Sequence, residues 1–279
     1  MENYYKRNND VLIVFLHIPK AGGTTLNGII NLQYSRNRII RANGINNAKS
    51  LLASLSAEEV ERIQMLRGHF AFGIHEFINR SCSYFTLLRD PVKRVISQYY
   101  YIRNSPSLPN HGLLNSISLE EYISREKDKL CNQQTRMLFG LSKAKCNSNS
   151  DMLDAVKQNL ETHFAVVGLT EMFDETLVLL RKKFGWKIPF YIRQNVRDKN
   201  RKSTSASEST LKLIEKYGEL DIELYHYVRA RFKDTIEQQE DSFAKDLAKI
   251  KMFNSAYQPV GRSYSFARHV LLHNLLKRY

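Results

Sequence analysis

A glycine turn between an apolar run and a helical segment constrains this chain more than any other feature. Residues 11–16 read Val-Leu-Ile-Val-Phe-Leu, which is typical of a buried strand, and residues 17–26 read His-Ile-Pro-Lys-Ala-Gly-Gly-Thr-Thr-Leu. Glycine lets the backbone approach a ligand closely, and the N–H groups and dipole of a helix N-terminus attract negative charge. Lys20 adds a cation, and Thr24 or Thr25 adds a hydroxyl donor. The pattern therefore predicts an anion pocket where a strand of an α/β fold meets a helix.

The spacing of this turn excludes two common nucleotide pockets. A Walker A loop places its lysine after the last glycine, whereas Lys20 precedes Gly22 and Gly23. The turn also lacks the G-x-G-x-x-G fingerprint of dinucleotide-binding folds. Taken alone, the turn leaves a second interpretation open, namely a structural strand-to-helix connection with a solvated lysine.

A second strand-to-helix element supports the anion pocket. Residues 84–88 read as a buried strand, Asp90 suits the N-cap of a following helix, and Pro91 suits its first position. Arg89 is therefore expected at the carboxyl end of a strand. Ser97 is expected about two turns into the helix.

These two elements together resemble the sulfotransferase family that includes the heparan sulfate 2-O- and 6-O-sulfotransferases. In that family the first element binds the 5′-phosphosulfate of 3′-phosphoadenosine 5′-phosphosulfate (PAPS), and the second binds its 3′-phosphate. The resemblance implies that Arg89 and Ser97 hold the 3′-phosphate in this chain. It also implies that the 5′ end is bound by the residues of the glycine turn, which are Lys20, Ala21, Gly22, Gly23, Thr24, Thr25 and Leu26.

Two later stretches extend the resemblance to about residues 11–232. Residues 132–138, Asn-Gln-Gln-Thr-Arg-Met-Leu, and residues 167–171, Val-Gly-Leu-Thr-Glu, are similar to segments of the 6-O-sulfotransferases. Arg136, in the first stretch, is a candidate substrate contact. Many sulfotransferases close a late basic loop over the nucleotide, and Arg201 and Lys202 are candidates for that role here.

Sulfuryl transfer from PAPS to a hydroxyl requires a cation and a base. By analogy with phosphoryl transfer, the leaving phosphate oxygen gains negative charge, which Lys20 can stabilise from its loop. The attacking hydroxyl loses its proton, and imidazole suits that task near neutral pH. In the resembling enzymes the base is a histidine that follows a glycine between the two PAPS elements, which favours His69 in Arg-Gly-His. His75 is the other candidate base or a substrate contact, and His17 is interpreted as a loop-shaping group.

The charge of the chain is strongly positive, because 42 lysines and arginines stand against 28 aspartates and glutamates, giving +14. The densest basic tract covers residues 181–202. Such a field attracts PAPS, an acidic glycan, nucleic acid or a lipid surface, although a solvated basic face is the ordinary alternative. We expect no nucleic-acid partner, because no zinc finger, helix-turn-helix or RNA-recognition signature is present. We expect no metal, because no Cys/His cluster has zinc spacing.

Cysteine usage and hydropathy bear on location. The three cysteines, Cys82, Cys131 and Cys146, cannot all form disulfides within one chain, which favours a reducing compartment. The apolar run at 11–16 is too short for a signal peptide or an anchor. Animal heparan sulfate enzymes carry a transmembrane anchor, and this chain departs from them there. We therefore expect a bacterial-type cytoplasmic protein, either free or peripheral to the membrane.

The pattern of apolar runs predicts one α/β domain over residues 1–238, with a P-loop-like central parallel sheet flanked by helices. A helical C-terminal extension over residues 239–279 is expected to pack on the domain, on a partner subunit in an oligomer, or on a membrane surface. The predicted strands are 11–17, 84–88 and 164–168, and the predicted helices are 24–34, 57–65, 91–103, 118–127, 151–160, 173–184 and 207–238. Residues 104–116 are predicted to form a loop.

The leading hypothesis is a PAPS-dependent sulfotransferase acting on a hydroxyl of a carbohydrate, such as an acidic glycan or a glycolipid, with His69 as the base. One alternative keeps the donor but sulfates protein tyrosine. Another is a basic nucleic-acid-binding or regulatory protein on the same scaffold without turnover. A nucleotide kinase is disfavoured by the position of Lys20.

Overall fold

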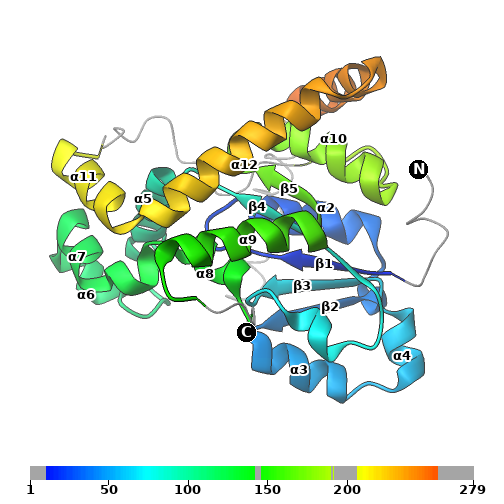
Figure 1. Ribbon diagram of the computed structural model, residues 1–279, viewed down its shortest axis with the longest axis horizontal. Coiled ribbons are helices and arrows are strands. Elements are labelled where there is room, and N and C mark those ends of the chain that lie inside the picture. Colours follow the sequence, from blue (N-terminus) through cyan, green and yellow to red (C-terminus); the bar gives the residue numbers. More distant parts are fainter. Residues whose placement is uncertain (1–10, 142–145, 190, 192–205, 257–279) are drawn as a thin grey trace, which may run out of the picture.

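A parallel sheet of five strands forms the centre of the computed structural model, which describes residues 11–141, 146–189, 191 and 206–256 (Figure 1). The spatial order of the strands is β2-β3-β1-β4-β5, and every neighbouring pair is parallel. The strands are β1 (Leu12–Leu16), β2 (Ile39–Asn43), β3 (Met65–His69), β4 (Cys82–Leu88) and β5 (Phe164–Leu169). The predicted parallel-sheet α/β fold is confirmed.

Helices lie between most of the strands, as is usual for parallel sheets, and also follow β5. They are α2 (Gly23–Gln33), α3 (Ile45–Ala53), α4 (Ala57–Arg62), α5 (Pro91–Arg103), α6 (His111–Ser116), α7 (Leu119–Leu130), α8 (Gln133–Phe139), α9 (Asn149–His163), α10 (Phe173–Phe184), α11 (Glu208–Tyr217) and α12 (Glu219–Glu237). Short 3₁₀ turns lie at Arg36–Arg38, Ile74–Phe77 and Thr170–Met172. Among the described helices, none is long and apolar enough to cross a bilayer.

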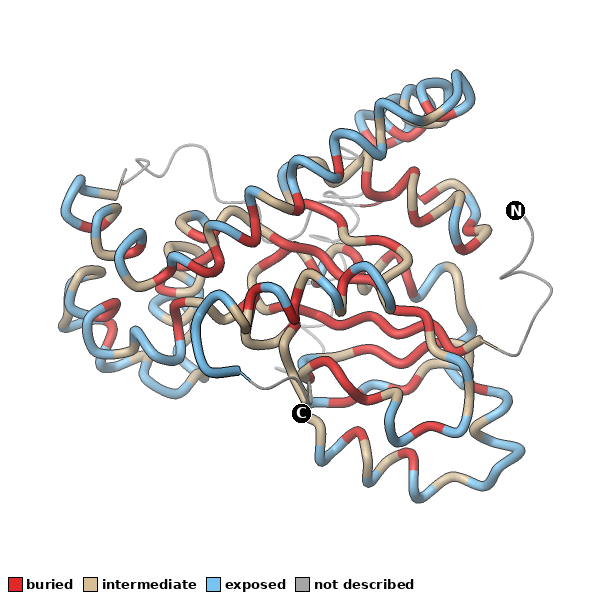
Figure 2. The backbone as a smooth tube through the Cα atoms, viewed as in Figure 1, coloured by how far each residue is buried: buried red, intermediate tan, exposed pale blue. Residues whose placement is uncertain are grey.

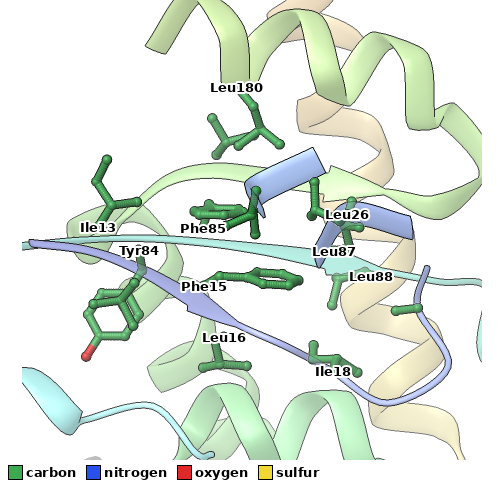
Figure 3. Close-up of a cluster of buried hydrophobic side chains, with 14 of the residues drawn as sticks. Ile13, Phe15, Leu16, Ile18, Leu26, Tyr84, Phe85, Leu87, Leu88 and Leu180 are labelled. Carbon is green, nitrogen blue, oxygen red and sulfur yellow. The ribbon is translucent and has the colours of Figure 1, made fainter. Parts of the chain in front are cut away.

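The core is built on the central strand β1, all five residues of which are buried. The rings of Phe15 in β1 and Phe85 in β4 stack with their centroids 4.8 Å apart. Figure 3 shows these rings with Leu26 of α2 and Leu180 of α10, and all four side chains are 0% exposed. In Figure 2 the central strands β1 and β4 are almost entirely buried, whereas the edge strand β2 alternates between buried and exposed residues. Apolar contact between the central strands and helices α2 and α10 therefore forms the main core.

A second apolar cluster holds a helical region at one end of the sheet. Its buried members include Val95 and Tyr99 of α5, Tyr122 and Ile123 of α7, and Ile214 of α11. In Figure 1 this region lies on the side toward which the arrows of β1 and β3 point. The carboxyl ends of the strands, where ligands bind in open α/β sheets, therefore face α5 and its neighbours.

Three predictions about secondary structure were wrong. The helix predicted over residues 57–65 ends at Arg62, and Met65 already belongs to β3. The helix predicted over residues 207–238 is two helices, because the chain bends at Gly218, where a Cβ would lie 2.7 Å from the carbonyl oxygen of Ile214. The loop predicted over residues 104–116 contains helix α6. Strands β2 and β3 and helix α3 were missed, because the two strands are short and each carries an arginine.

The described part of the C-terminal extension packs on α10. Residues 241–256 are helical, and Phe243 and Ile250 are buried in the main core. Asp246 forms an ion pair with Arg181 of α10, and the Asn254 side chain accepts a hydrogen bond from a backbone N–H. Residues 257–279 lie outside the described residues, and the domain boundary at residue 238 stays a prediction.

Candidate active site

The two predicted elements meet at the carboxyl edge of three neighbouring strands. β3 ends at His69, β1 leads into the glycine turn, and β4 ends immediately before Arg89. The Arg89 side chain donates from Nη1 to the carbonyl oxygen of Lys20 at 2.9 Å. This contact joins segments 69 positions apart in the sequence, so the two predicted elements lie side by side.

The glycine turn is shaped by two residues with positive φ and by one close approach. Lys20 has φ +67° and Gly22, the N-cap of α2, has φ +80°, a region that glycine adopts without strain. At Gly23, a Cβ would lie 1.9 Å from Nε2 of His17, so the buried imidazole occupies the space of any side chain. The order Lys-x-Gly-Gly is therefore set by the path of the backbone and by His17.

The N-terminus of α2 offers an anion cradle. Its cap is a glycine, no side chain caps it, and its first turn carries no acidic residue. Thr24 is exposed and Thr25 is half-buried, so their hydroxyl groups lie beside this end of the helix. The side chains of Ala21 and Leu26 are buried at 1% and 0% exposure, and their N–H groups bond to the carbonyl oxygens of Ile18 and Gly22, so neither N–H group is available to a ligand. The cradle therefore consists mainly of backbone N–H groups and the helix dipole.

Arg89 is fixed by a glutamine that the sequence did not single out. The Gln134 side chain accepts from the Arg89 N–H at 3.0 Å and donates to the Arg89 carbonyl oxygen at 2.9 Å. Gln134 is fully buried on α8, within the Asn-x-Gln stretch that carried part of the resemblance. The glutamine of that stretch therefore sets the backbone from which Arg89 reaches the glycine turn.

The ammonium of Lys20 rests on an aromatic ring. Its Nζ lies 3.5 Å from the centroid of Tyr101 on α5. Burial, and then the nearby Arg89 charge, lower the pKa of Lys20 to about 8. Lys20 and Arg89 therefore place two cationic groups next to the N-terminus of α2.

His69 is held in one tautomer. Its Nδ1 lies 2.7 Å from the carbonyl oxygen of His17, and because a carbonyl only accepts, Nδ1 carries the proton. In the neutral ring Nε2 is then unprotonated and able to accept a proton. The side chain is exposed at the end of β3. Geometry therefore presents a solvent-accessible base at this position.

The His17 ring also packs against the His69 ring. The two imidazole rings lie 4.1 Å apart between centroids, and the other neighbour of His17 is Phe15, whose ring stacks at 5.2 Å. Burial, and then the charges of His69, Arg67 and Lys20, lower the pKa of His17 to about 3. His17 is therefore neutral at physiological pH, which agrees with its interpretation as a loop-shaping group.

A pair of arginines from β3 and β2 contacts α2. Arg67 of β3 donates to the Asn27 carbonyl oxygen at 3.0 Å and to Asn31 Oδ1 at 2.7 Å. Arg41, its register partner in β2, donates to the same Asn31 oxygen at 3.3 Å. The sequence did not reveal this group, because its members come from three separate elements.

Ser97 lies half-buried on α5, one turn after a buried ion pair that the sequence also did not reveal. The Arg94 guanidinium lies 3.9 Å from the Asp221 carboxylate of α12, and the side chains are 0% and 1% exposed. Asp221 also accepts from the N–H and the hydroxyl of Thr135, both at 2.8 Å. This network fastens α8 and α12 to the helix that carries Ser97.

Two further predicted residues, His75 and Arg136, make hydrogen bonds away from the glycine turn. His75 bonds to Tyr84 Oη through its Nδ1 at 2.9 Å and contacts the His163 ring at 4.6 Å. Arg136 donates to the Cys131 and Lys129 carbonyl oxygens at the end of α7. These contacts account for both side chains, and their roles toward a substrate stay predictions.

Arg201 and Lys202 lie outside the described residues. Within the described ranges, no group of three or more histidine, cysteine, aspartate or glutamate side chains is arranged to hold a metal ion.

Comparisons with known proteins place the chain among sulfotransferases. The sequence model of the family described as galactose-3-O-sulfotransferase matches residues 3–255. Chicken heparan-sulfate 6-O-sulfotransferase 2 is 27% identical over 277 positions, which cover 80% of this chain and 67% of that protein. The human protein of the same name is 26% identical, and the match covers 80% of this chain but 45% of that protein. Human heparan-sulfate 6-O-sulfotransferase 1 is 25% identical over 85% of this chain and 70% of its own length.

Among solved structures, a mouse sulfotransferase complexed with PAP aligns over 77% of this chain and 66% of its own, with a TM-score of 0.38 and 14% identity.

Proposed function

This chain belongs to the galactose-3-O-sulfotransferase family, and we propose that it transfers a sulfuryl group from PAPS to a hydroxyl of a carbohydrate acceptor. The observation that carries the proposal is the meeting of three groups at the carboxyl edge of β3, β1 and β4. These are the base at His69, the anion cradle of α2, and the cations of Lys20 and Arg89. Charge stabilisation and proton removal, the two demands of the reaction, are thus met in one place.

The donor site is supported by the N-terminus of α2, which has a glycine cap and no acidic residue in its first turn. A Cβ at Gly23 would collide with His17, so glycine at this position allows the turn to pack on the imidazole. We assign the 5′-phosphosulfate to this cradle with Lys20, and the 3′-phosphate to Arg89 and Ser97. Bound there, PAPS supplies an activated sulfuryl group whose S–O bond to the 5′-phosphate breaks as the acceptor oxygen bonds to sulfur.

Lys20 stabilises the charge that develops on the 5′-phosphate oxygen. Its loop adjoins the cradle, and its ammonium is half-buried, so water screens it less than a surface lysine. Arg89 contributes indirectly as well, because its hydrogen bond to the Lys20 carbonyl fixes the left-handed backbone from which Lys20 projects.

His69 accepts the proton of the attacking hydroxyl at Nε2. The carbonyl of His17 holds the Nδ1 proton in place, so the accepting lone pair faces away from the turn, toward solvent. The resulting imidazolium keeps its hydrogen bond to that carbonyl, which stabilises the charge. A base in this position contributes on the order of 10²–10⁴ to the rate.

A carbohydrate acceptor suits the surroundings of His69. Asn43, its register partner in β2, is exposed, as is Asn46 at the start of the next helix. Amide side chains donate and accept hydrogen bonds, which matches the hydroxyl groups of sugars. The names of the relatives also refer to glycan substrates, which supports an acceptor of this class.

An acceptor screen with labelled PAPS tests this function. Pools of desulfated glycans, glycolipids and tyrosine peptides are incubated with the protein, and label incorporated into each pool is counted. We expect label in a carbohydrate pool and none without protein. Label in the peptide pool alone would contradict the carbohydrate assignment, and no transfer to any pool together with no binding of PAP, the nucleotide product, would contradict the donor.

Three further expectations stay predictions. These are a cytoplasmic location, the absence of a nucleic-acid partner, and oligomerisation through the C-terminal helices. Fractionation, DNA binding over a range of salt concentrations, and light scattering test them in turn.

A further inference from the structure

The ring that carries the Lys20 ammonium comes from the helix that carries Ser97. Tyr101 follows Ser97 by one helical turn on α5, so the two side chains share a face of that helix. Tyr101 is 44% exposed, and the Lys20 Nζ lies 3.5 Å from its centroid. The contact therefore spans the gap between the 5′-phosphosulfate and 3′-phosphate elements of the proposed donor site.

Lys20 lies among positively charged groups that destabilise its ammonium. The Arg89 guanidinium binds the Lys20 carbonyl oxygen, and the N-terminus of α2 carries the positive end of the helix dipole. Burial and Arg89 lower the pKa of Lys20 to about 8. A partly buried ammonium needs a compensating partner, such as a carboxylate.

Among the described residues, Asp90 and Glu171 are acidic side chains close to Arg89, and both make other hydrogen bonds. Asp90 caps α5 by accepting from the Lys93 N–H at 2.9 Å. Glu171 accepts from the Asp90 N–H at 3.3 Å and from the Tyr225 hydroxyl at 3.0 Å. A carboxylate beside Lys20 would also repel an anionic donor, whereas an aromatic face attracts a cation through its quadrupole without adding a charge.

We propose that Tyr101 is a positioning residue, whose ring face holds the Lys20 ammonium beside the glycine turn and thereby strengthens binding of the phosphosulfate donor. This rests on the proposed role of Lys20. The ring acts through Lys20, and its hydroxyl group is not required. A phenylalanine should therefore replace it, whereas an aliphatic side chain of similar size should not.

The structure offers a matched control in Phe77. That ring is also 44% exposed and also carries a lysine, because the Lys49 Nζ lies 3.6 Å from its centroid. It belongs to the 3₁₀ turn Ile74–Phe77, away from the glycine turn. Phe77→Leu removes an equivalent contact without touching the donor site.

The experiment measures PAP affinity by calorimetry and the titration of Lys20 by NMR of ¹³C-methylated lysines, assigned with Lys20→Arg. For Tyr101→Leu we expect PAP to bind about 3- to 10-fold more weakly, and the Lys20 pKa to fall by about half to one unit. Tyr101→Phe and Phe77→Leu should match the wild type in both measurements. Because Tyr101 is on the surface, thermal melting of each variant should stay close to that of the wild type.

Wild-type affinity and an unchanged Lys20 titration in folded Tyr101→Leu would overturn the proposal. A changed titration with unchanged PAP affinity would overturn its link to donor binding. If wild-type protein does not bind PAP, the proposed function itself fails, and the NMR titration still shows separately whether Tyr101 supports the Lys20 charge.

Discussion

Replacing Gly23 by alanine should disrupt the glycine turn through His17. The new Cβ would start 1.9 Å from Nε2 of His17, far inside van der Waals contact. The imidazole has little room to withdraw, because it is 9% exposed and packed between Phe15 and His69. Moving it would also move the carbonyl and ring that orient His69.

The magnitude follows from two opposing terms. Overpacking a well-filled site costs about 1–3 kcal/mol, with larger values when rings must shift. Gly23 is the first residue of α2, and replacing glycine by alanine within a helix stabilises the helix by up to about 1 kcal/mol. We therefore expect Gly23→Ala to lower the free energy of unfolding by about 1–2 kcal/mol.

Two other glycines serve as controls in the same assay, urea unfolding followed by circular dichroism. At Gly22 a Cβ meets nothing closer than 3.5 Å, but φ is +80°, so alanine costs about 1 kcal/mol through backbone strain alone. At Gly112 on the exposed helix α6, a Cβ meets nothing within 4 Å, so alanine should be neutral or stabilising. Gly23→Ala with wild-type stability and wild-type PAP affinity would refute the close packing of His17 on the turn.

Three further predictions concern charge. The pKa of His17 is about 3 in the folded protein and near 6.5 in the unfolded chain, so burial of the neutral ring does not oppose folding above about pH 6.5. As pH falls from 6.5 toward 3, the unfolded chain binds the proton first, and the free energy of unfolding should decrease by about 1.4 kcal/mol per pH unit. His17→Phe should flatten this part of the stability curve measured by urea unfolding. The pKa of Lys20 is about 8, so PAP affinity measured by calorimetry should fall above pH 8, by up to about tenfold per pH unit. Lys20→Arg should remove this inflection, because arginine stays charged. A flat pH profile in the wild type would contradict the role of Lys20 in binding. Asp221→Asn leaves the buried Arg94 guanidinium without its carboxylate and should lower the free energy of unfolding by about 3–5 kcal/mol. Glu58→Gln breaks an exposed ion pair with Arg62 and should change the free energy of unfolding by less than about 1 kcal/mol. Equal effects of the two variants would contradict the buried network.

Local signals in the sequence predicted the elements that carry them. Helix α5 begins and ends as predicted, because Asp90 accepts from the Lys93 N–H and Pro91 occupies the first position. Strand β1 was predicted within one residue at each end, because a short unbroken apolar run is typical of a buried strand in a parallel sheet. The meeting of the glycine turn with Arg89 was also foreseen, and the bond to the Lys20 carbonyl accounts for it.

The parts that could not be predicted depend on contacts between distant segments. The His69 tautomer is set by a carbonyl 52 positions earlier, and Thr135 is held by Asp221, 86 positions later. Such contacts leave no periodicity in the sequence. Strand β3, which delivers His69, reads Met-Leu-Arg-Gly-His, and the sequence pattern does not separate so short a segment from a loop.

The most direct test of the account compares single-turnover sulfuryl transfer by the wild type and by His69→Ala, with PAP affinity measured in parallel. His226→Ala, on the exposed face of α12, is the matched control and should behave as wild type. We expect His69→Ala to slow transfer by about 10²-fold or more while PAP affinity changes by less than about twofold. Near-wild-type transfer by His69→Ala would contradict the assignment of His69 as the base.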